Sequence, residues 1–228
     1  MKERPILFSA PMVRAILAGT KTQTRRAAKL TANGHVKESG GHRRWHPGDP
    51  DARLACPYGQ PGDRLWVRET WAAPHSDDAR PPRSIHCDWT QIHYAATEER
   101  GGLMWRPSIH MPRWASRITL EITGVRVERL KDISEDDAVA EGIECHEHAV
   151  GTIGTRVDTV RCIHCGSLRR DHVGVAMACF GGSGTVWNGN TARGGFSFLW
   201  ESINGAGSWE ANPWVWVVEF KRVEGSAA

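Results

Sequence analysis

The stretch PILFSAPMVRAILAGTKTQTRR, residues 5–26, combines a short helix with an unusual basic segment. Ser9 can cap the helix, Pro11 suits its first turn, and Gly19 fits the left-handed position at its end. One apolar stripe along this helix is formed by Met12, Val13, Ile16 and Leu17. The following hydroxyls and cations, in AGTKTQTRR at 18–26, are typical of neither an amphipathic helix nor a plain strand.

In the rest of the chain, alternation of apolar and polar residues predicts several strands. They lie in PGDRLWVRETW (61–71), QIHYAA (91–96), RITLEITGVRVERL (117–130) and NPWVWVVEFKRV (212–223). We expect a bulge at Gly124 in the longest of them. In the last strand the predicted apolar face consists of Trp214, Trp216, Val218 and Phe220.

Two further helices are predicted by their end signals. In DISEDDAVAEGI (132–143), Ser134 and Asp137 form a capping box and Gly142 ends the helix. FSFLWESING (196–205) ends at Gly205. We interpret 27–62 as a long loop, WRPSIHMPRWASR (105–117) as a structured loop, and about 145–195 as an insertion, within a single domain spanning 1–228. Short strands, few helices and long loops predict a small α+β barrel.

The composition is that of an ordinary soluble protein of 228 residues, with 11 tryptophans as its outlier. The net charge of +3 permits a nucleic-acid partner without requiring one. The absence of a signal peptide or of an apolar stretch of 18 residues predicts a cytoplasmic protein with no membrane partner. The six cysteines are then expected to be free thiols or metal ligands rather than disulfides.

Two glutamates stand where a carboxylate is locally unfavourable. Glu69 shares the predicted apolar face of its strand with Leu65, Val67 and Trp71, which indicates either a buried partner or a position at the water line. Glu141 lies in the last turn of its helix, the wrong end of the helix dipole for an acid.

The basic segment itself contains a candidate base and nucleophile. Lysine in a dry pocket has a lowered pKa and can take the proton of a threonine hydroxyl, so Lys21 and Thr24 form such a pair. Residues three apart face opposite sides of a straight strand, so this pairing requires a turn or bulge after the helix. The alternatives are a solvated basic turn and a phosphate contact.

The same stretch resembles the start of ASCH domains, members of the PUA-like superfamily in which a helix precedes a G-x-K-x-x-x-R motif. Gly19, Lys21 and Arg25 or Arg26 occupy those places. PGDRLWV (61–67), ISEDDAVAEGI (133–143) and PWVWVVEF (213–220) resemble a strand, a helix and the last strand of the family. With PSIHMPRWASRITLEI, the pattern resembles the longer phage and prophage ASCH proteins. The resemblance spans 4–26, 60–72, 108–143 and 195–222, and it implies a PUA-like barrel.

Within that family, the chain is similar to the small bacterial N4-acetylcytidine amidohydrolases. Their motif G-x-K-T-x-T-x-R is matched in full by Gly19, Lys21, Thr22, Thr24 and Arg26. Their glutamate, near the end of the helix, falls on Glu141. The resemblance therefore implies a catalytic set of Lys21, Thr24 and Glu141, with no cofactor required for catalysis. Backbone N–H groups after Gly19, or Arg26, would stabilise the oxyanion.

Other residues are candidates for binding the substrate, a modified nucleoside or nucleobase. Glu69 could accept hydrogen bonds from a base edge and Trp71 could stack on its face. The alternative is a core tryptophan and a buried ion pair of Glu69 with Arg68 or Arg26. Around RPSIHMPRW, the residues His110, Arg113 and Trp114 would border the pocket or brace the barrel. The predicted binding set is Arg26, Glu69, Trp71, Ser9 and Arg113.

The insertion contains CIHCGSLRRDHVGVAMAC, residues 162–179. Its spacing C-x2-C-x6-H-x6-C predicts a structural zinc site made by Cys162, Cys165, His172 and Cys179, the alternative being a reduced loop with incidental thiols. A catalytic zinc deaminase would need an H-x-E partner motif, which the sequence lacks.

The sequence thus predicts an amidohydrolase acting on N4-acylated cytosine or cytidine. The alternative is an RNA- or DNA-binding ASCH module, or a ribonuclease, with Lys21, Arg25 and Arg26 on phosphates.

Overall fold

The structure is a computed structural model of the chain. The residues that it describes are 1–37, 44–77, 79–85, 92–98, 101–146, 160–161, 168–169, 177–179, 186–187 and 192–223.

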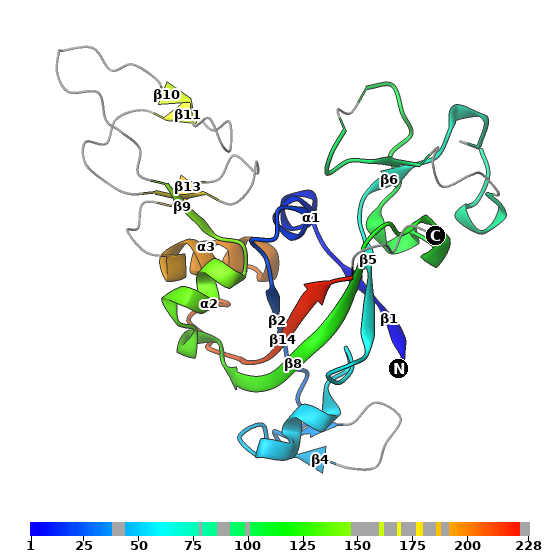
Figure 1. The fold of residues 1–228 in the computed structure, drawn as a ribbon. Helices are drawn as coiled ribbons and strands as arrows, with labels where there is room; N and C mark the ends of the chain where they lie inside the picture. Colours follow the sequence, from blue (N-terminus) through cyan, green and yellow to red (C-terminus); the bar gives the residue numbers. More distant parts are fainter. Residues whose placement is uncertain are drawn as a thin grey trace, which may run out of the picture.

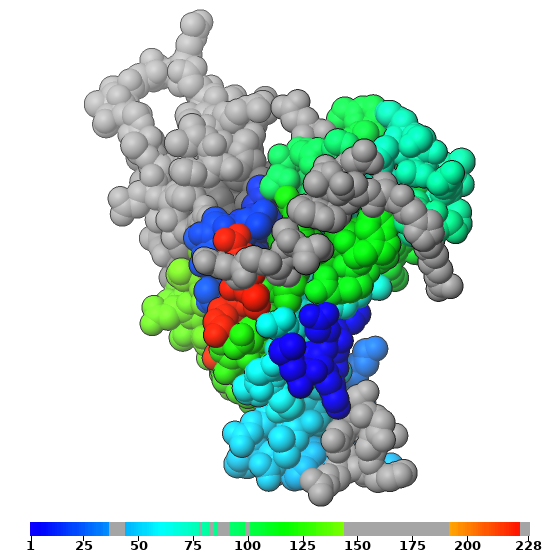
Figure 2. All heavy atoms as spheres, turned by 45° about the vertical axis from the view of Figure 1, so that its right-hand side comes forward, coloured from blue at the N-terminus to red at the C-terminus, as the bar shows by residue number. Residues whose placement is uncertain are grey.

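A mixed five-stranded sheet organises the fold (Figure 1). In spatial order its strands are β1 (Glu3–Leu7), β5 (Arg64–Arg68), β8 (Thr119–Arg129), β14 (Trp214–Arg222) and β2 (Gln23–Ala27). Only β1 and β5 are parallel, and the three other neighbouring pairs are antiparallel. On the face drawn in Figure 2, red atoms of the C-terminal region accordingly lie against blue atoms of the N-terminal region.

The bulge predicted in the longest strand is confirmed. Glu219 of β14 lies opposite Gly124 of β8, whereas the next residue, Phe220, lies opposite Ile122, which leaves Thr123 without a partner in the register. An extra residue of this kind bends the strand and increases its twist. In Figure 1, β8 is accordingly drawn as a long, strongly curved strand beside β14.

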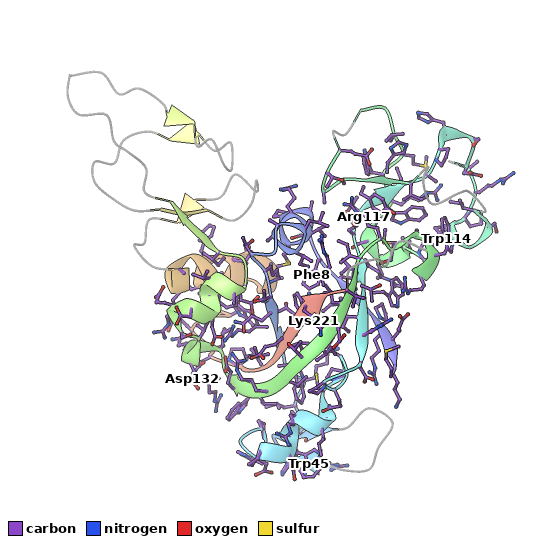
Figure 3. All side chains as sticks on the ribbon, in the orientation of Figure 1. Phe8, Trp45, Trp114, Arg117, Asp132 and Lys221 are labelled. Carbon is purple, nitrogen blue, oxygen red and sulfur yellow. The ribbon has the colours of Figure 1, made fainter. Side chains whose placement is uncertain are left out.

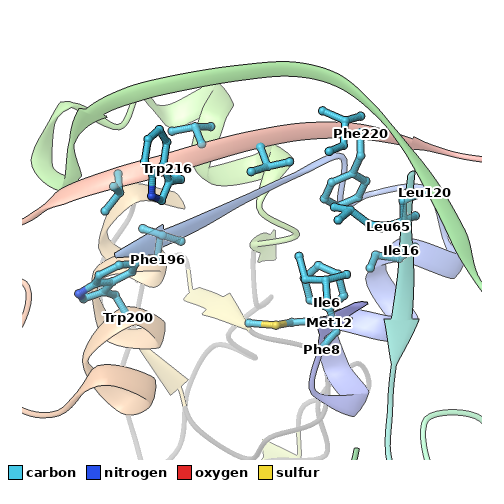
Figure 4. Packing of buried hydrophobic residues seen from close by; sticks show 14 of the residues in the cluster. Ile6, Phe8, Met12, Ile16, Leu65, Leu120, Phe196, Trp200, Trp216 and Phe220 are labelled. Carbon is cyan, nitrogen blue, oxygen red and sulfur yellow. The ribbon is translucent and has the colours of Figure 1, made fainter. Parts of the chain in front are cut away.

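Helix α1 (Ala10–Leu17) packs the apolar stripe predicted from the sequence against the sheet, with Met12, Val13 and Ile16 buried. Ser9 is its N-cap residue and Pro11 lies in its first turn, as predicted, although the Ser9 side chain makes no capping hydrogen bond. Figure 4 shows Met12 beside Ile6 and Phe8, and Ile16 beside residues of the central strands. The N-terminal helix and the sheet therefore share one core.

The last strand, β14, is covered on both of its faces. Trp216, Val218 and Phe220 are buried as predicted, but Val215 and Val217, on the other face, have no exposed surface. The helices α2 (Glu135–Ala140) and α3 (Ala192–Asn204) contribute to the same core, with Ala138, Phe196, Leu199 and Trp200 among its members. The strand therefore has near-continuous hydrophobicity because it is central rather than half-exposed.

The predicted α+β class is confirmed, but the strands of the described residues do not close into a barrel. The strands β1 and β2 are the two edges of the sheet, since β1 pairs with β5 alone and β2 with β14 alone. The chain crosses between these two edges through α1, a helix, so this connection supplies no strand to join them. The architecture shown is an open, strongly curved sheet with few helices.

The sequence predicts one long loop over 27–62, but the structure contains regular elements there. They are a short hairpin of β3 (Val36–Lys37) and β4 (Arg44–Trp45), followed by the 3₁₀ helix η1 (Pro50–Ala55). The buried hydrophobic core residues here are Val36, Ala52, Ala55 and Cys56. They are small and irregularly spaced, and therefore produce no periodic signal.

A second, smaller cluster lies beyond β5. Here β6 (Trp71–Ala72) pairs with β7 (His93–Tyr94), and the predicted structured loop forms the 3₁₀ turns η5 (Ser108–His110) and η6 (Arg113–Ala115). The buried members of this cluster are Trp71, Ala73, Ile85, Ile92, Tyr94, Met111 and Ala115. Other short 3₁₀ turns are η2 (His75–Asp77), η3 (Pro82–Ser84) and η7 (Leu130–Asp132).

Within the predicted insertion, the residues that the structure describes ahead of α3 form short strands. They are β9 (Glu144–His146), β10 (Val160–Arg161), β11 (Leu168–Arg169), β12 (Met177–Cys179) and β13 (Val186–Trp187). Strand β12 pairs with both β9 and β13. Helix α3 begins at Ala192, four residues before the predicted stretch, and Gly205 follows its end with a φ of 96°.

Candidate active site

The chain reverses sharply after α1, and this turn places Lys21. Gly19 adopts the left-handed conformation predicted for it, with a φ of 78°. The backbone N–H groups of Thr20 and Lys21 then both donate to the carbonyl of Ala15, at 3.0 and 3.1 Å. Lys21 forms an isolated antiparallel bridge with Glu141, ahead of strand β2. This turn precedes Lys21 and directs it toward Glu141, while Lys21 and Thr24 remain three residues apart along extended backbone.

The ammonium of Lys21 is enclosed by Glu141. Its Nζ lies 2.7 Å from Glu141 Oε2 and 2.8 Å from the Glu141 carbonyl oxygen. The Lys21 side chain is fully buried and that of Glu141 is 3% exposed. Burial lowers the pKa of Lys21 because it penalises the charged form, and the nearby Arg26 and Arg25 lower it further, whereas Glu141 opposes the shift.

Glu141 is the C-cap residue of α2, and its position at this end of the helix is explained by its partners. Besides Lys21, it accepts a hydrogen bond from Arg25 Nη1 at 3.3 Å on its other oxygen, Oε1. Two cations therefore offset the unfavourable helix dipole. Gly142 follows with a φ of 86°, and a Cβ added there would lie 3.2 Å from the Cβ of Lys21.

The N-terminus of α2 is capped as predicted by Ser134, whose hydroxyl accepts a hydrogen bond from the N–H of Asp137 at 3.0 Å. The Asp137 carboxylate is directed elsewhere, since it accepts from Arg25 at 2.9 Å, from Arg126 at 3.0 and 3.1 Å, and from Gln23 at 3.1 Å. Helix α2 is therefore fixed to the sheet by charge-assisted hydrogen bonds at both ends.

These contacts belong to one group of charged side chains, which we call the β2–α2 charge cluster. Its cations are Lys21, Arg25 and Arg126, and its anions are Glu128, Asp137, Glu141 and Glu219. The members come from the turn before β2 and from β2, β8, β14 and α2. Four anions face three cations, so the cluster as a whole is close to neutral.

Thr24 is buried on β2, opposite Val218 of β14. Successive side chains of a strand point to opposite faces, so Thr24 faces away from Gln23 and Arg25 and shares a face with Arg26. Val218 and its strand neighbour Trp216 lie on this same face through the register of the pair.

Lys21 and Arg26 both lie near the ring of Phe8, and Arg26 belongs to the face of β2 that carries Thr24. Arg26 lies over the Phe8 ring at 5.3 Å from its centroid, and Lys21 Nζ lies 5.8 Å from the same centroid. Arg26 also donates from Nη2 to the carbonyl of Leu7 at 2.6 Å. Figure 3 shows Phe8 near the middle of the molecule, between α1 and the central strands. The structure thus brings Lys21 and Glu141 into direct contact and places Thr24 in β2, on the strand face that also carries Arg26.

Glu69 has a partner that the sequence did not indicate. Strand β5 ends at Arg68, and the Glu69 carboxylate, 1% exposed, accepts hydrogen bonds from Arg117 Nε and Nη2, both at 3.0 Å. Burial nevertheless raises the pKa of Glu69, against the effect of this arginine. Arg117 in turn stacks on the ring of Tyr94, 4.0 Å from its centroid. The ion-pair alternative is therefore favoured, with Arg117 in place of Arg68 or Arg26.

The other predicted binding residues lie apart from the charge cluster. Trp71 has no exposed surface and packs edge-on against Trp114, with ring centroids 6.1 Å apart. Arg113 pairs with Glu3 at 3.0 Å on the outside of the sheet, and Ser9 is exposed at the start of α1. Within the predicted binding set, Arg26 is the residue that shares a contact, the Phe8 ring, with the catalytic candidate Lys21.

The predicted zinc ligands Cys162, Cys165 and His172 lie outside the described residues, and of Cys179 the structure describes only the backbone, in β12. Among the residues that are described, no group of three or more His, Cys, Asp and Glu side chains is arranged to hold a metal ion. Nor does any helix in the described ranges have the length and apolar character needed to cross a membrane.

Sequence reasoning missed the arginines that complete the cluster. The sequence predicts Arg25 as a possible motif arginine or phosphate contact, and Arg126 and Glu128 only as members of a strand. Arg126 and Glu128 share one face of β8, and a cation and an anion two apart on one strand face are a local signal for an ion pair, which the structure contains at 2.9 Å. This local signal covers only their contact with each other, because Glu128 also pairs with Arg25, 103 residues away, and Arg126 with Glu219, 93 residues away.

Comparisons with protein-family models, with curated proteins and with solved structures found no match for this chain.

Proposed function

We propose that this chain is an ASCH-type domain of the PUA-like superfamily that hydrolyses the amide of N4-acylated cytosine or cytidine. The observation that carries the proposal is the buried contact of Lys21 with Glu141, at 2.7 Å between Nζ and Oε2. These are two of the three residues that the resemblance to the N4-acetylcytidine amidohydrolases implies. They are 120 residues apart in the chain, and a basic turn in solvent would not bring them together.

Lys21 is suited to act as the general base. A neutral amine has two N–H donors and one lone pair, and Glu141 offers two acceptors, its carbonyl oxygen at 2.8 Å and its Oε2 at 2.7 Å. With both donors held, the lone pair is free to take a hydroxyl proton. Burial and the neighbouring arginines favour the neutral form by lowering the pKa of Lys21.

Thr24 is the proposed nucleophile. Its Oγ1 forms a bond to the acyl carbon while its proton passes to Lys21 Nζ. The bond from the acyl carbon to N4 then breaks, N4 takes the proton from Lys21, and the cytosine base leaves with a free amino group. Water attacks the resulting threonine ester, which regenerates Thr24 and releases the carboxylate. One water is consumed for each amide cleaved, and Glu141 keeps Lys21 in place through both steps.

Arg26 is the candidate for stabilising the oxyanion. It lies two residues after Thr24 on the same face of β2, and its guanidinium is partly exposed beside Phe8. A donor placed where negative charge develops contributes about 10²–10³-fold in turnover. The backbone N–H groups after Gly19 are less suited to this role, since those of Thr20 and Lys21 already donate to Ala15.

The burial of two of the three proposed phosphate contacts weighs against the alternative of a nucleic-acid-binding module. The side chains of Lys21 and Arg25 have no exposed surface, and carboxylates pair with both. Phosphate contacts require cations that face solvent and release counterions. Of the three residues considered for that role, Arg26 alone retains exposure.

The experiment that tests the proposal compares Thr24→Ala with Thr20→Ala. Thr20 is an exposed threonine four residues earlier, and it serves as the matched control. We expect wild type and Thr20→Ala to release acid and cytidine from N4-acetylcytidine, and Thr24→Ala to lose this activity while its unfolding transition persists. Turnover by Thr24→Ala, or none by wild type across a series of N4-acylcytosines and N4-acylcytidines, would refute the assignment.

A salt series separates the enzyme from the binding module. Hydrolysis of a small neutral nucleoside should change little between 50 and 200 mM salt, taken as roughly the range over which phosphate-dependent binding falls steeply. Oligonucleotide binding that weakens steeply over this range, without hydrolysis, would favour the module.

A further inference from the structure

The Glu141 carboxylate is divided between two cations, one on each oxygen. Lys21 takes Oε2 at 2.7 Å, and Arg25 takes Oε1 at 3.3 Å. Both cations are fully buried, and the carboxylate itself is nearly so. The orientation of the carboxylate relative to Lys21 is therefore set jointly by a lysine, which can lose a proton, and an arginine, which remains charged.

Arg25 is itself held rigidly. Its Nε and Nη2 donate to Glu128 Oε1 at 3.1 and 2.6 Å, and its Nη2 also donates to Asp137 Oδ2 at 2.9 Å. The guanidinium lies over the ring of Phe196 of α3, 5.8 Å from its centroid. Strand β8 and helices α2 and α3 therefore fix the donor that reaches Glu141. A planar fork anchored on three sides is a suitable device for orienting a carboxylate.

We propose that Arg25 is a positioning residue for the hydrolase: it holds Oε1 of Glu141 so that Oε2 and the Glu141 carbonyl keep Lys21 aligned as the base. This inference rests on the proposed function. Arg25 touches neither the reacting atoms nor the substrate in this role. It acts through Glu141, and its removal should alter the protonation of Lys21 before it alters anything else at the site.

The direction of that change follows from the charges around Lys21. The groups that face its ammonium are Glu141 from α2, Arg25 and Arg26 from β2, and the ring of Phe8. Removing the positive charge of Arg25 takes away a repulsion and leaves the whole Glu141 carboxylate to Lys21. Both changes stabilise the charged lysine, so its pKa should rise and the fraction of neutral base at a given pH should fall.

The variants that test this are Arg25→Gln and Arg25→Lys, with Arg126→Gln as the matched control. Arg126 shares Glu128 and Asp137 with Arg25, and its third partner is Glu219 rather than Glu141. It therefore reproduces the loss of a cluster cation without the contact in question. Arg25→Lys retains the charge and is expected to fold where Arg25→Gln does not, but a single ammonium cannot reproduce the fork.

The first readout is the titration of Lys21 itself, followed by the ¹³Cε NMR signal and assigned by its absence in Lys21→Arg. We expect its midpoint to rise in Arg25→Gln, to rise less in Arg25→Lys, and to stay at the wild-type value in Arg126→Gln. The second readout is the pH profile of kcat for N4-acetylcytidine. Its acid limb should move with the titration, at about a tenfold loss of rate per pH unit of displacement.

An unchanged Lys21 midpoint in both Arg25 variants would overturn the proposal, and so would an equal rise in Arg126→Gln. The NMR titration needs no substrate, so it distinguishes the two proposals. If wild type hydrolyses no N4-acylcytidine but the titration moves as expected, the proposed function fails while the coupling of Arg25 to Lys21 stands. If hydrolysis is observed but neither Arg25 variant moves the titration or the acid limb, the positioning role alone is refuted.

Discussion

Glu141 and Glu69 are both buried carboxylates paired with a cation, but they are built differently. Glu69 receives both of its hydrogen bonds from one arginine, Arg117, at 3.0 Å each. Glu141 divides its oxygens between Arg25 and Lys21. The first arrangement is a closed pair whose cation does not lose its proton at any ordinary pH. The second contains a lysine whose protonation can change.

The two glutamates differ in whether their cation can lose a proton, and this difference separates a structural ion pair from a candidate active site. A bidentate pair of a carboxylate and an arginine occupies both carboxylate oxygens and suits a structural brace, here between the residue after β5 and Arg117, two residues before β8. A buried lysine with a lowered pKa has a proton that can move. The sequence marked both glutamates as unusual, and only their partners separate a brace from a candidate active site.

The largest expected effect is that of Lys21→Met on catalysis. Methionine fills a similar volume and removes the base, while Arg25 still holds Glu141. We expect kcat to fall on the order of 10³-fold, within the range for loss of a general base. Hydrolysis kinetics and a thermal unfolding curve measure the two consequences separately. If Lys21→Met folds and keeps the wild-type kcat, Lys21 has a structural role like that of Arg117, and it is not the catalytic base.

Glu69→Gln should show the opposite pattern, with lost stability and retained catalysis. Breaking a buried ion pair costs about 3–5 kcal/mol, and the partial exposure of Arg117 reduces this to roughly 2–3 kcal/mol. Denaturant unfolding measures the loss, and Glu98→Gln, at a half-exposed pair with His93, is the control with an expected cost below about 1 kcal/mol. An increase in KM without loss of stability would instead support the role in substrate binding predicted from the sequence.

Gly142→Ala tests how closely the Lys21 contact depends on backbone packing. The substitution forces a side chain into a positive φ, at a cost of about 1–2 kcal/mol, and its Cβ would lie 3.2 Å from that of Lys21. Gly207→Ala carries a similar φ of 80° in open space and is the control. We expect both variants to lose stability and only Gly142→Ala to lose hydrolysis. Equal activities would show that the position of Lys21 tolerates displacement.

The smallest expected effect is a pair of opposite pH dependences of stability. The pKa of Lys21 is lowered on folding, so the unfolded chain binds more protons between that pKa and the ordinary value of about 10.4. Wild type should therefore gain stability relative to Lys21→Met as pH rises through this window. The pKa of Glu69 is raised by burial, so wild type should lose stability relative to Glu69→Gln as pH rises from about 4.3 through the raised pKa. Denaturant midpoints measured across pH check both slopes. If the slopes attributed to Lys21 and to Glu69 had the same sign, the proposed difference between the two sites would be wrong.

Much of the fold near the site could be predicted from local signals. The helix ends at Ser9, Gly19, Ser134 and Gly142 and the bulge at Gly124 each depend on residues within a few positions, and the structure confirms them. Helix α3 was also found, although its start was not. The hairpin and 3₁₀ helix within 27–62 were missed because their buried residues are small and aperiodic.

The site was predictable only in part. Lys21 and Glu141 were paired through the family resemblance, and the contact between them is in the structure. Arg25, Arg126 and Glu128 were not assigned to it, because their pairing depends on the register of β2, β14 and β8. The partner of Glu69 was wrong for a similar reason, since Arg117 lies 48 residues away. Zinc binding by the Cys and His residues of the insertion, together with hydrolysis itself, stays a prediction.

The position of β2 in the sheet has a consequence for the order of assembly. This strand carries Thr24 and lies in the first part of the sequence, yet among the described strands it pairs with β14 alone, and the N–H of Phe220 donates to the carbonyl of Thr22. During synthesis, residues 23–27 emerge early and have no strand to pair with until about residue 222 has left the ribosome. Contacts of such long sequence separation form late and slowly. We therefore expect the candidate active site to be among the last parts of the molecule to fold, so that hydrolysis would report completion of the whole sheet.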